Sequence, residues 1–215
     1  MEKIYDKFYS RLVEWVGRNS YFKKHERSAI ISFLKDMGAK KVLDFGCNVG
    51  FTSSEFKKHT NADVYGTDIN DYALARGRQK YPEVNFVSLD EVKSMKKEFD
   101  VIVVSNVLEH VPDCHETLSF LKSLLSPDGK IIISVPQERI KGDCNIPHIV
   151  LCSLENKRYT NPHLRVLKWK ALNQVLEQES IEIEKHAYVN MLPPFFSKKY
   201  VWPTAMSLVA VCKRA

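Results

Sequence analysis

Short apolar runs alternate with amphipathic stretches between Lys41 and Pro136, and this alternation predicts strands that are each followed by a helix. Continuous runs such as VIVV at 101–104 and III at 131–133 are typical of strands that are buried on both faces, as in parallel sheets. Repeated strand–helix–strand units predict an α/β fold with a mostly parallel open sheet. The segment Ser126–Gly129 predicts a type I turn before the last of these strands. The predicted strands are Lys41–Phe45, Asp63–Thr67, Val84–Val87, Asp100–Val104 and Lys130–Val135, and the predicted helices lie near 50–59, 71–80 and 113–125.

The two ends of the chain carry different patterns. Apolar residues at helical spacing predict a helical extension in two pieces over residues 1–40, with Gly38 as a C-cap. The regular pattern stops after Pro136 and resumes at about Lys168, and a long irregular segment of this kind is typical of a loop beside a functional site. The remaining predicted elements are a helix from about Trp169 and two late strands near 181–189 and 206–213.

Composition narrows the class of protein. The 215 residues include 32 Lys+Arg and 26 Asp+Glu, which gives a formal charge of +6, and 44% of the residues are hydrophobic. These values are ordinary for a globular domain and exclude a disordered chain, and no apolar run is long enough to predict a membrane span. The basic residues are scattered rather than clustered, so the positive charge gives little support to a nucleic-acid partner.

The cysteines and the first residues bear on location. Five widely spaced cysteines without a CxxC pair predict reduced thiols and a cytoplasmic protein. The opening MEKIYDKFYSRL interrupts each apolar stretch with charges, which is not the pattern of a secretory signal. Cys144, His148 and Cys152 are spaced four apart and suggest zinc, but Pro147 interrupts any helix that would align them. We therefore expect a loop with reduced thiols there.

The segment VLDFGCNVG at 42–50 joins a predicted strand to a predicted helix through a glycine-containing turn. Gly46 and Gly50 permit tight backbone geometry and close approach of a ligand, and the following helix offers free N–H groups. In an open α/β sheet, nucleotides bind at the carboxyl ends of such strands. Asp44 disfavours a pyrophosphate and favours a cationic ligand, such as the sulfonium and ammonium groups of S-adenosylmethionine.

Five segments in order resemble the motifs of the class I S-adenosylmethionine-dependent methyltransferases. They are VLDFGCNVG (42–50), VYGTDIN (64–70), VNFVSLDEV (84–92), FDVIVVSNVLEHVPD (99–113) and LLSPDGKIIISVP (124–136). The resemblance implies a Rossmann-like fold, in which a mostly parallel seven-stranded sheet with an antiparallel last strand carries helices on both faces. It also implies a methyltransferase domain over 41–215, with a cofactor half at 41–136 and a substrate half at 137–215.

The resemblance implies a set of residues that bind S-adenosylmethionine. Asp68 follows Gly50 by 18 residues, close to the roughly 20-residue spacing of a ribose-binding carboxylate, and its alternative role is a cap beside Asn70. Asn48 stands where the family usually has glycine. Asn tolerates left-handed backbone angles, but the departure leaves open a non-catalytic cofactor-binding or interaction domain. The full set is Asp44, Gly46, Asn48, Gly50, Asp68, Ile69, Leu89, Asp90 and Asn106, with Leu89 and Asp90 beside the adenine.

The stretch NVLEH, 106–110, resembles a Glu-x-x-Glu-His element of two methyltransferase groups, which act on ubiquinone precursors and on small RNAs and hold a divalent cation there. Asn106 replaces the first glutamate, so an anionic ligand is missing and we predict no metal. His110 is instead a candidate catalytic base, with packing at a strand–helix junction as the alternative. His163, the second candidate catalytic residue, and Arg165 belong to an H-x-R element expected to face the substrate, with helix-entry capping as the alternative.

The sequence therefore predicts an S-adenosylmethionine-dependent methyltransferase, similar to the ubiquinone-pathway O-methyltransferase group. The predicted partner is a small-molecule methyl acceptor that is methylated at a hydroxyl oxygen. The alternative acceptor is an RNA 2′-hydroxyl, which fits the charge of +6 but lacks a basic cluster interleaved with exposed aromatic residues. The aromatic link at 190–204 is expected to pack against the sheet edge rather than form a wall of the substrate site.

Overall fold

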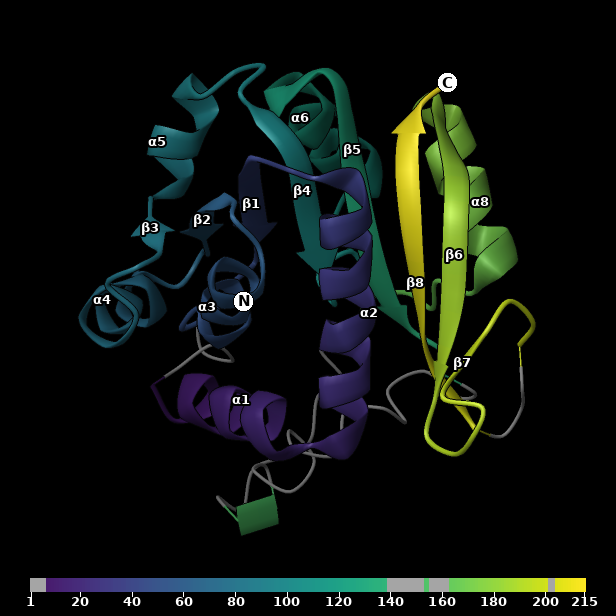
Figure 1. Ribbon diagram of the computed structural model, residues 1–215, viewed down its shortest axis with the longest axis horizontal. Helices are drawn as coiled ribbons and strands as arrows, with labels where there is room; N and C mark the ends of the chain where they lie inside the picture. The colour runs from purple at the N-terminus through teal and green to yellow at the C-terminus, as the bar shows by residue number, and fades with distance from the viewer. Residues whose placement is uncertain (1–6, 139–152, 155–162, 201–203) are drawn as a thin grey trace.

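The computed structural model describes residues 7–138, 153–154, 163–200 and 204–215. Figure 1 shows a central sheet with helices on both of its faces. The helices are α1 (Lys7–Asn19), α2 (Tyr21–Met37), α3 (Phe51–His59), α4 (Asp71–Lys80), α5 (Leu89–Ser94), α6 (Cys114–Leu124) and α8 (Trp169–Gln178). The strands are β1 (Lys41–Phe45), β2 (Asp63–Thr67), β3 (Asn85–Phe86), β4 (Phe99–Ser105), β5 (Leu125–Pro136), β6 (Ile181–Asn190), β7 (Phe196–Ser197) and β8 (Ala205–Arg214).

Eight strands of the described chain form the sheet, in the order β3-β2-β1-β4-β5-β8-β6-β7. Strands β1 to β5 are parallel to one another, whereas β8 runs antiparallel to both β5 and β6. This topology confirms the predicted α/β fold with a mostly parallel sheet and an antiparallel last strand. All seven predicted strands are present, and the two-residue strand β7 adds an eighth beside β6.

Two local features differ from the sequence predictions. The segment Ser126–Gly129 is not a separate turn but lies within β5, because Leu125 already pairs with Phe99 of β4 and the register then shifts. The short helix α5 was not predicted, because six residues are too few to show a helical period.

The alternation of side chains along the strands builds one apolar core on each face of the sheet. Ile102 and Val104 of β4 belong to the core that α6 and α8 cover, while Val101 and Val103 belong to the core that α2, α3 and α4 cover. The helical residues in these cores include Leu118, Leu121, Leu172 and Leu176 on one face and Ile30, Leu34, Phe56 and Leu74 on the other. The two cores fix where each parallel strand ends.

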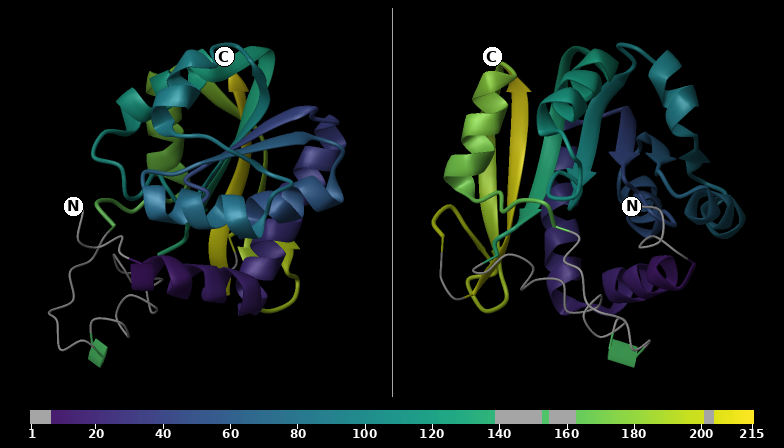
Figure 2. Two further views of the ribbon diagram at one scale, coloured as in Figure 1. Left: turned by 90° about the vertical axis from the view of Figure 1, so that its left-hand side faces the viewer. Right: turned by 180° about the vertical axis from the view of Figure 1, so that it is seen from behind.

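Helices α1 and α2 bring the N-terminal part of the chain to the carboxyl ends of the parallel strands. Helix α2 contacts β6 and β8 and ends at Gly38, which has the left-handed φ of 58° that a C-cap requires, as predicted. Figures 1 and 2 show α1 lying across the end of the sheet where β1 and β4 finish. Side chains from these helices can therefore contribute to a site at that edge.

Candidate active site

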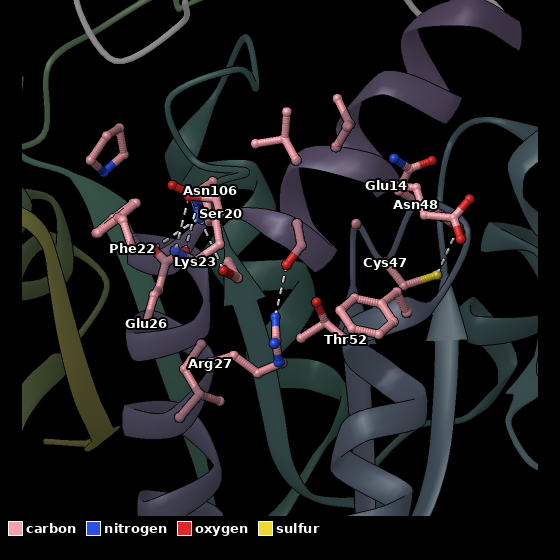
Figure 3. Close-up of a pocket in the computed structure, with 18 of the residues that line it drawn as sticks. Glu14, Ser20, Phe22, Lys23, Glu26, Arg27, Cys47, Asn48, Thr52 and Asn106 are labelled. Carbon is pink, nitrogen blue, oxygen red and sulfur yellow. Dashed lines mark hydrogen bonds and ion pairs between the residues drawn. The ribbon is translucent and has the colours of Figure 1, made fainter. Parts of the chain in front are cut away.

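A cavity of about 410 Å³ lies at the carboxyl ends of β1, β4 and β5, and Figure 3 shows side chains from several elements pointing into it. This volume falls within the range of small-molecule and cofactor sites. Seven of the predicted site residues line the cavity, namely Asp44, Gly46, Asn48, Gly50, Asn106, His110 and His163. Helices α1 and α2 add Glu14, Lys23, Glu26 and Arg27, which the sequence did not single out.

The glycine-containing loop adopts a backbone that glycine alone accommodates at two of its positions. Gly46 and Gly50 have φ angles of 82° and 83°. A Cβ atom on Gly46 would overlap the side chain of Val107, and one on Gly50 would overlap the ring of Phe86. The loop therefore has the backbone form predicted for Gly46 and Gly50, and the start of α3 at Phe51 and Thr52 lines the cavity.

Asp44 is the next-to-last residue of β1, close to this loop, and is almost fully buried. Its Oδ2 accepts a hydrogen bond from Ser53 Oγ at 2.6 Å. Burial, together with the nearby negative charge of Asp68, raises the pKa of Asp44 to about 7, although the bond from Ser53 acts in the opposite direction. A cationic ligand in the cavity would stabilise the ionised carboxylate, which is the role predicted for this residue.

The pKa of Asp44 leads to a prediction for Asp44→Asn. The folded-state pKa lies above the unfolded value of 3.8, so the contribution of this group to stability is complete below pH 3.8 and is lost as the pH rises through 7. A neutral amide avoids that loss. We expect the variant to be more stable at pH 8 by on the order of 2 kcal/mol, with a smaller gain at pH 6, and to bind S-adenosylmethionine at least tenfold more weakly. Thermal unfolding at both pH values and calorimetry test this, and a gain that is equal at both would contradict it.

Asp68 lies directly behind the loop rather than on the cavity wall. Its Oδ2 accepts a hydrogen bond from the backbone N–H of Asn48 at 2.7 Å, and its Oδ1 accepts one from the N–H of Asn70 at 2.9 Å. The N-cap of α4 is Asn70, whose side chain accepts from the N–H of Ala73 at 3.3 Å. Asp68 thus joins the glycine-containing loop to the start of α4, and its contact with the ribose stays a prediction.

The residues predicted beside Asp68 and the adenine also lie off the described cavity wall. Ile69 is 77% exposed. Leu89 and Asp90 begin α5, where Asp90 is exposed and pairs with Lys93 at 2.7 Å. A capping box between Ser88 and Glu91 starts this helix. The structure does not bring these residues together with the cavity, and their roles stay predictions.

Asn48, the departure from the usual glycine, adopts the left-handed conformation with φ of 49°. Its side chain faces α1, where Oδ1 accepts a hydrogen bond from Ser10 Oγ at 2.5 Å and Nδ2 donates to the Ser10 carbonyl at 3.3 Å. The side chain that a glycine would lack therefore fastens α1 to the cofactor loop. Asn48 therefore has a structural use at this position.

Glu26 of α2 organises the floor of the cavity, and the sequence analysis missed it. Its Oε1 accepts hydrogen bonds from Ser134 Oγ at 2.5 Å, Ser207 Oγ at 2.6 Å and Asn106 Nδ2 at 3.2 Å, and its Oε2 accepts from Lys23 Nζ at 2.6 Å. Burial alone would raise the pKa of Glu26, but Lys23 and the two serines outweigh burial and lower it. The sequence signal that could have identified Glu26 is its spacing of four residues from Ile30, which places a charged residue on the buried face of α2.

A second group of polar side chains lies where β4 and β5 end. Glu109, His110 and His163 each place a potential ligand or proton-transfer atom within 4.8 Å of one another. The His110 and His163 rings meet edge to face, with centroids 4.7 Å apart. His163 Nδ1 lies 2.5 Å from Oε1 of the buried Glu138, a residue that the sequence analysis missed. The two predicted catalytic histidines are therefore brought together, although they are 53 positions apart in the sequence.

Glu109 is the least satisfied member of this group. It is 1% exposed, and both of its carboxylate oxygens lack a hydrogen-bond partner among the described residues. Burial raises its pKa to about 8. A carboxylate with two imidazoles is a donor set that suits a divalent transition-metal ion, so these residues fit a cation. Asn106 uses its Nδ2 group to donate to Glu26 Oε1 and to Ser105 Oγ.

Two other sequence expectations concern Arg165 and a possible zinc site. Arg165 does not face the cavity as predicted; its guanidinium donates to the carbonyls of Leu108, Val111 and Pro112 instead. The reason is local, since that loop presents several carbonyl groups that an arginine can satisfy together. The spaced residues Cys144, His148 and Cys152 lie outside the described residues.

Comparison with known proteins agrees with this architecture. A family model described as a methyltransferase domain matches residues 17–184. A ubiquinone biosynthesis O-methyltransferase of Actinobacillus pleuropneumoniae is 30% identical over 154 residues, covering 63% of this chain and 65% of the relative. The enzyme of the same name from Coxiella burnetii is 32% identical over 109 residues, covering 47% of this chain and 46% of the relative.

Solved structures share the fold at lower identity. The 1,6-didemethyltoxoflavin-N1-methyltransferase of Burkholderia thailandensis, with bound S-adenosylhomocysteine, has a TM-score of 0.64 and 19% identity, covering 96% of this chain and 88% of that one. The magnesium protoporphyrin IX methyltransferase of Synechocystis has a TM-score of 0.62 and 18% identity, covering 90% and 84%. These values establish the fold.

The strand order, the glycine-containing loop after β1 and the buried carboxylate beneath it define the class of S-adenosylmethionine-dependent methyltransferases. The chain belongs to the methyltransferase domain family, and S-adenosylmethionine is its cofactor. Its matches span 65% and 46% of the two curated relatives, so their full activity is not carried over with the fold. None of the helices in the described part of the chain combines the length and apolar character of a membrane span.

Proposed function

We propose that this protein transfers a methyl group from S-adenosylmethionine to a hydroxyl oxygen of a small molecule. The observation that carries the proposal is that the Glu109–His110–His163 group shares one cavity with the glycine-containing cofactor loop. A hydroxyl must lose its proton as it attacks, and imidazole titrates in the right range to take it. The names of the O-methyltransferase relatives add support for oxygen as the acceptor atom.

In the proposed mechanism the chain acts mainly by positioning. The bound cofactor supplies an electrophilic methyl group. Asp44 holds the cationic groups of the cofactor, and the N–H groups at the start of α3 hold its carboxylate, while the loop around Asn48 shields these groups from water. His110 accepts the proton of the acceptor hydroxyl on its imidazole, and His163, held by Glu138, fixes the orientation of that ring.

An acceptor panel tests the proposal. Purified protein is incubated with S-adenosylmethionine and 3,4-dihydroxybenzoate, a simple phenol, an aromatic amine or an aromatic thiol, and S-adenosylhomocysteine is quantified. We expect methyl transfer to the hydroxyl compounds and none to the matched analogue without a hydroxyl. Transfer to the amine or thiol alone would overturn the assignment of oxygen.

A specific observation favours a divalent cation as part of this site. Glu109 has two buried oxygens without a partner among the described residues, and a cation held with His110 and His163 would satisfy them. Such a cation would be an alternative to proton transfer by His110, whose imidazole would then be a ligand, and it would supply a Lewis acid that lowers the pKa of a bound hydroxyl. This proposal replaces the metal-free expectation from the sequence.

The cation leads to a prediction that does not depend on turnover. Mn²⁺ should bind with one-to-one stoichiometry in an electron paramagnetic resonance titration and should raise the melting temperature by a few degrees. Glu109→Gln should weaken binding at least tenfold. Glu179→Gln is the matched control, because Glu179 also pairs with a histidine, His115, on the surface. Binding that is equal in all three proteins would place Mn²⁺ elsewhere.

An RNA 2′-hydroxyl is the alternative acceptor, supported by the formal charge of +6. Binding of a short single-stranded RNA that falls steeply with salt would support it, because phosphate contacts release counterions. Weak binding that is insensitive to salt would exclude it and leave the small-molecule acceptor.

The same proposal gives a role to each part of the chain and a location to the protein in the cell. We assign cofactor binding to 41–136, acceptor choice to 137–215 and closure of the cavity to the helices before residue 41. A cytoplasmic location is supported by Cys47, Cys114 and Cys212, which are free thiols and buried.

A further inference from the structure

The loop between β4 and α6 carries Glu109 and His110, and residues outside the loop make most of the hydrogen bonds that hold it. Within the loop, the His110 N–H donates to the Val107 carbonyl at 2.9 Å. The carbonyl groups of the next residues instead accept hydrogen bonds from a separate segment, which begins at His163 and precedes α8. The position of two members of the polar group therefore depends on contacts made by this crossing segment.

Arg165 makes most of those contacts. Its Nη1 donates to the carbonyls of Leu108 at 3.1 Å and Val111 at 2.5 Å and lies 2.9 Å from Cys114 Sγ, and its Nη2 donates to the carbonyl of Pro112 at 2.7 Å. The neighbouring Leu164 N–H donates to the Glu109 carbonyl at 2.7 Å. A planar guanidinium with several fixed donors can bind convergent carbonyls in this way, whereas an ammonium group cannot match the geometry.

We propose that Arg165 is a positioning residue, which sets the loop carrying Glu109 and His110 against the segment carrying His163. His163 precedes Arg165 by two residues, so the contacts of Arg165 fix the spacing between the three side chains of the group. The inference rests on the proposed function in one respect only, namely that this group acts on the acceptor. Arg165 itself is not among the described residues that line the cavity.

The chain contains a matched control for this role. Arg214, near the C-terminus, donates from Nη1 to the carbonyls of Ser126 and Pro127 at 2.8 Å and from Nη2 to those of Lys122 and Leu125 at 2.8 and 3.1 Å. Figure 1 shows the C-terminus at the end of the sheet opposite α1, whereas the cavity is lined by residues at the carboxyl ends of β1, β4 and β5. Loss of Arg214 removes the same kind of bonds without disturbing the site.

The experiment compares Arg165→Met, Arg165→Lys and Arg214→Met. The imidazole signals of His110 and His163 are observed in ¹H–¹³C spectra and assigned with His110→Gln and His163→Gln. We expect Arg165→Met to shift both signals and to lower kcat on the best hydroxyl acceptor about 10- to 100-fold, with the Kd for S-adenosylmethionine changed less than twofold. Arg165→Lys should recover part of kcat, and Arg214→Met should lower the melting temperature without moving either signal.

Two outcomes would overturn the proposal. One is unshifted histidine signals in both Arg165→Met and Arg165→Lys, and the other is an equal loss of kcat in Arg214→Met. If Arg165→Met does not fold, the comparison of Arg165→Lys with Arg214→Met decides. Shifted histidine signals in a protein that methylates no hydroxyl would support the positioning role and refute the proposed function, so the two failures are distinguishable.

Discussion

Replacing Gly50 by alanine should destabilise the protein by about 2–5 kcal/mol and weaken S-adenosylmethionine binding at least 100-fold. The residue has a φ of 83°, which disfavours any side chain, and the added Cβ would overlap the ring of Phe86. That ring cannot retreat, because it is buried and already packs against the backbone at Gly66 and Gly77. The loop must therefore move, and with it the N–H groups that we propose hold the cofactor.

Gly38→Ala is the matched control for this prediction. Gly38 also has a positive φ, 58°, but nothing lies within 4 Å of its Cβ position, and it ends α2 away from the loop. We expect a cost of about 1 kcal/mol and an unchanged Kd for S-adenosylmethionine. Thermal unfolding and calorimetric titration measure both quantities. Tight cofactor binding by Gly50→Ala would show that the loop does not hold the cofactor.

Replacing His163 by glutamine should lower kcat by about 10²–10⁴-fold, while the Kd for S-adenosylmethionine changes by less than about threefold. His163 is buried, holds its ring against Glu138 and meets the ring of His110 edge to face. A glutamine amide can still donate to Glu138, so the fold should survive while the imidazole at the acceptor end is lost. The loss should therefore appear in turnover rather than in cofactor binding.

His115→Gln is the control for the second prediction. His115 also pairs with a glutamate, with its Nδ1 3.2 Å from Glu179 Oε1, and it is not among the described residues that line the cavity. We expect its kcat to equal that of the unmodified protein. An equal loss in both variants, or a loss of cofactor affinity in His163→Gln that matches its loss of kcat, would contradict a role for His163 at the acceptor.

The region predicted to bind the cofactor could be predicted from the sequence because the patterns that mark it lie within a few consecutive residues. The bounds of β1 and β2 match the prediction, since each contains a short apolar run between an amphipathic stretch and a turn. Gly46 and Gly50 have the positive φ angles that their place between a strand and a helix requires. The region predicted to lie beside the adenine was harder to predict from the sequence, because α5 depends on one capping box rather than on a periodic pattern.

The acceptor side was only partly predictable. His110 and His163 could be singled out from short motifs, but no motif marked Glu138, which orients His163. Arg165 was predicted at the site on the same motif evidence and proved to bind loop carbonyls instead. A motif predicts which side chains carry suitable chemistry, whereas the direction in which each one points depends on its packed neighbours.

The sequence by itself determined the α/β order of elements, the strand–glycine turn–helix that is predicted to hold the cofactor and the two histidines that share its cavity. Only the tertiary structure decided that Glu26 joins α2 to Ser134 and Ser207, residues 108 and 181 positions away, and that Asn48 binds Ser10. The physical reason is that backbone propensity and apolar period act over a few residues. Polar partners that are distant in the sequence meet only after the two cores have fixed the ends of the strands.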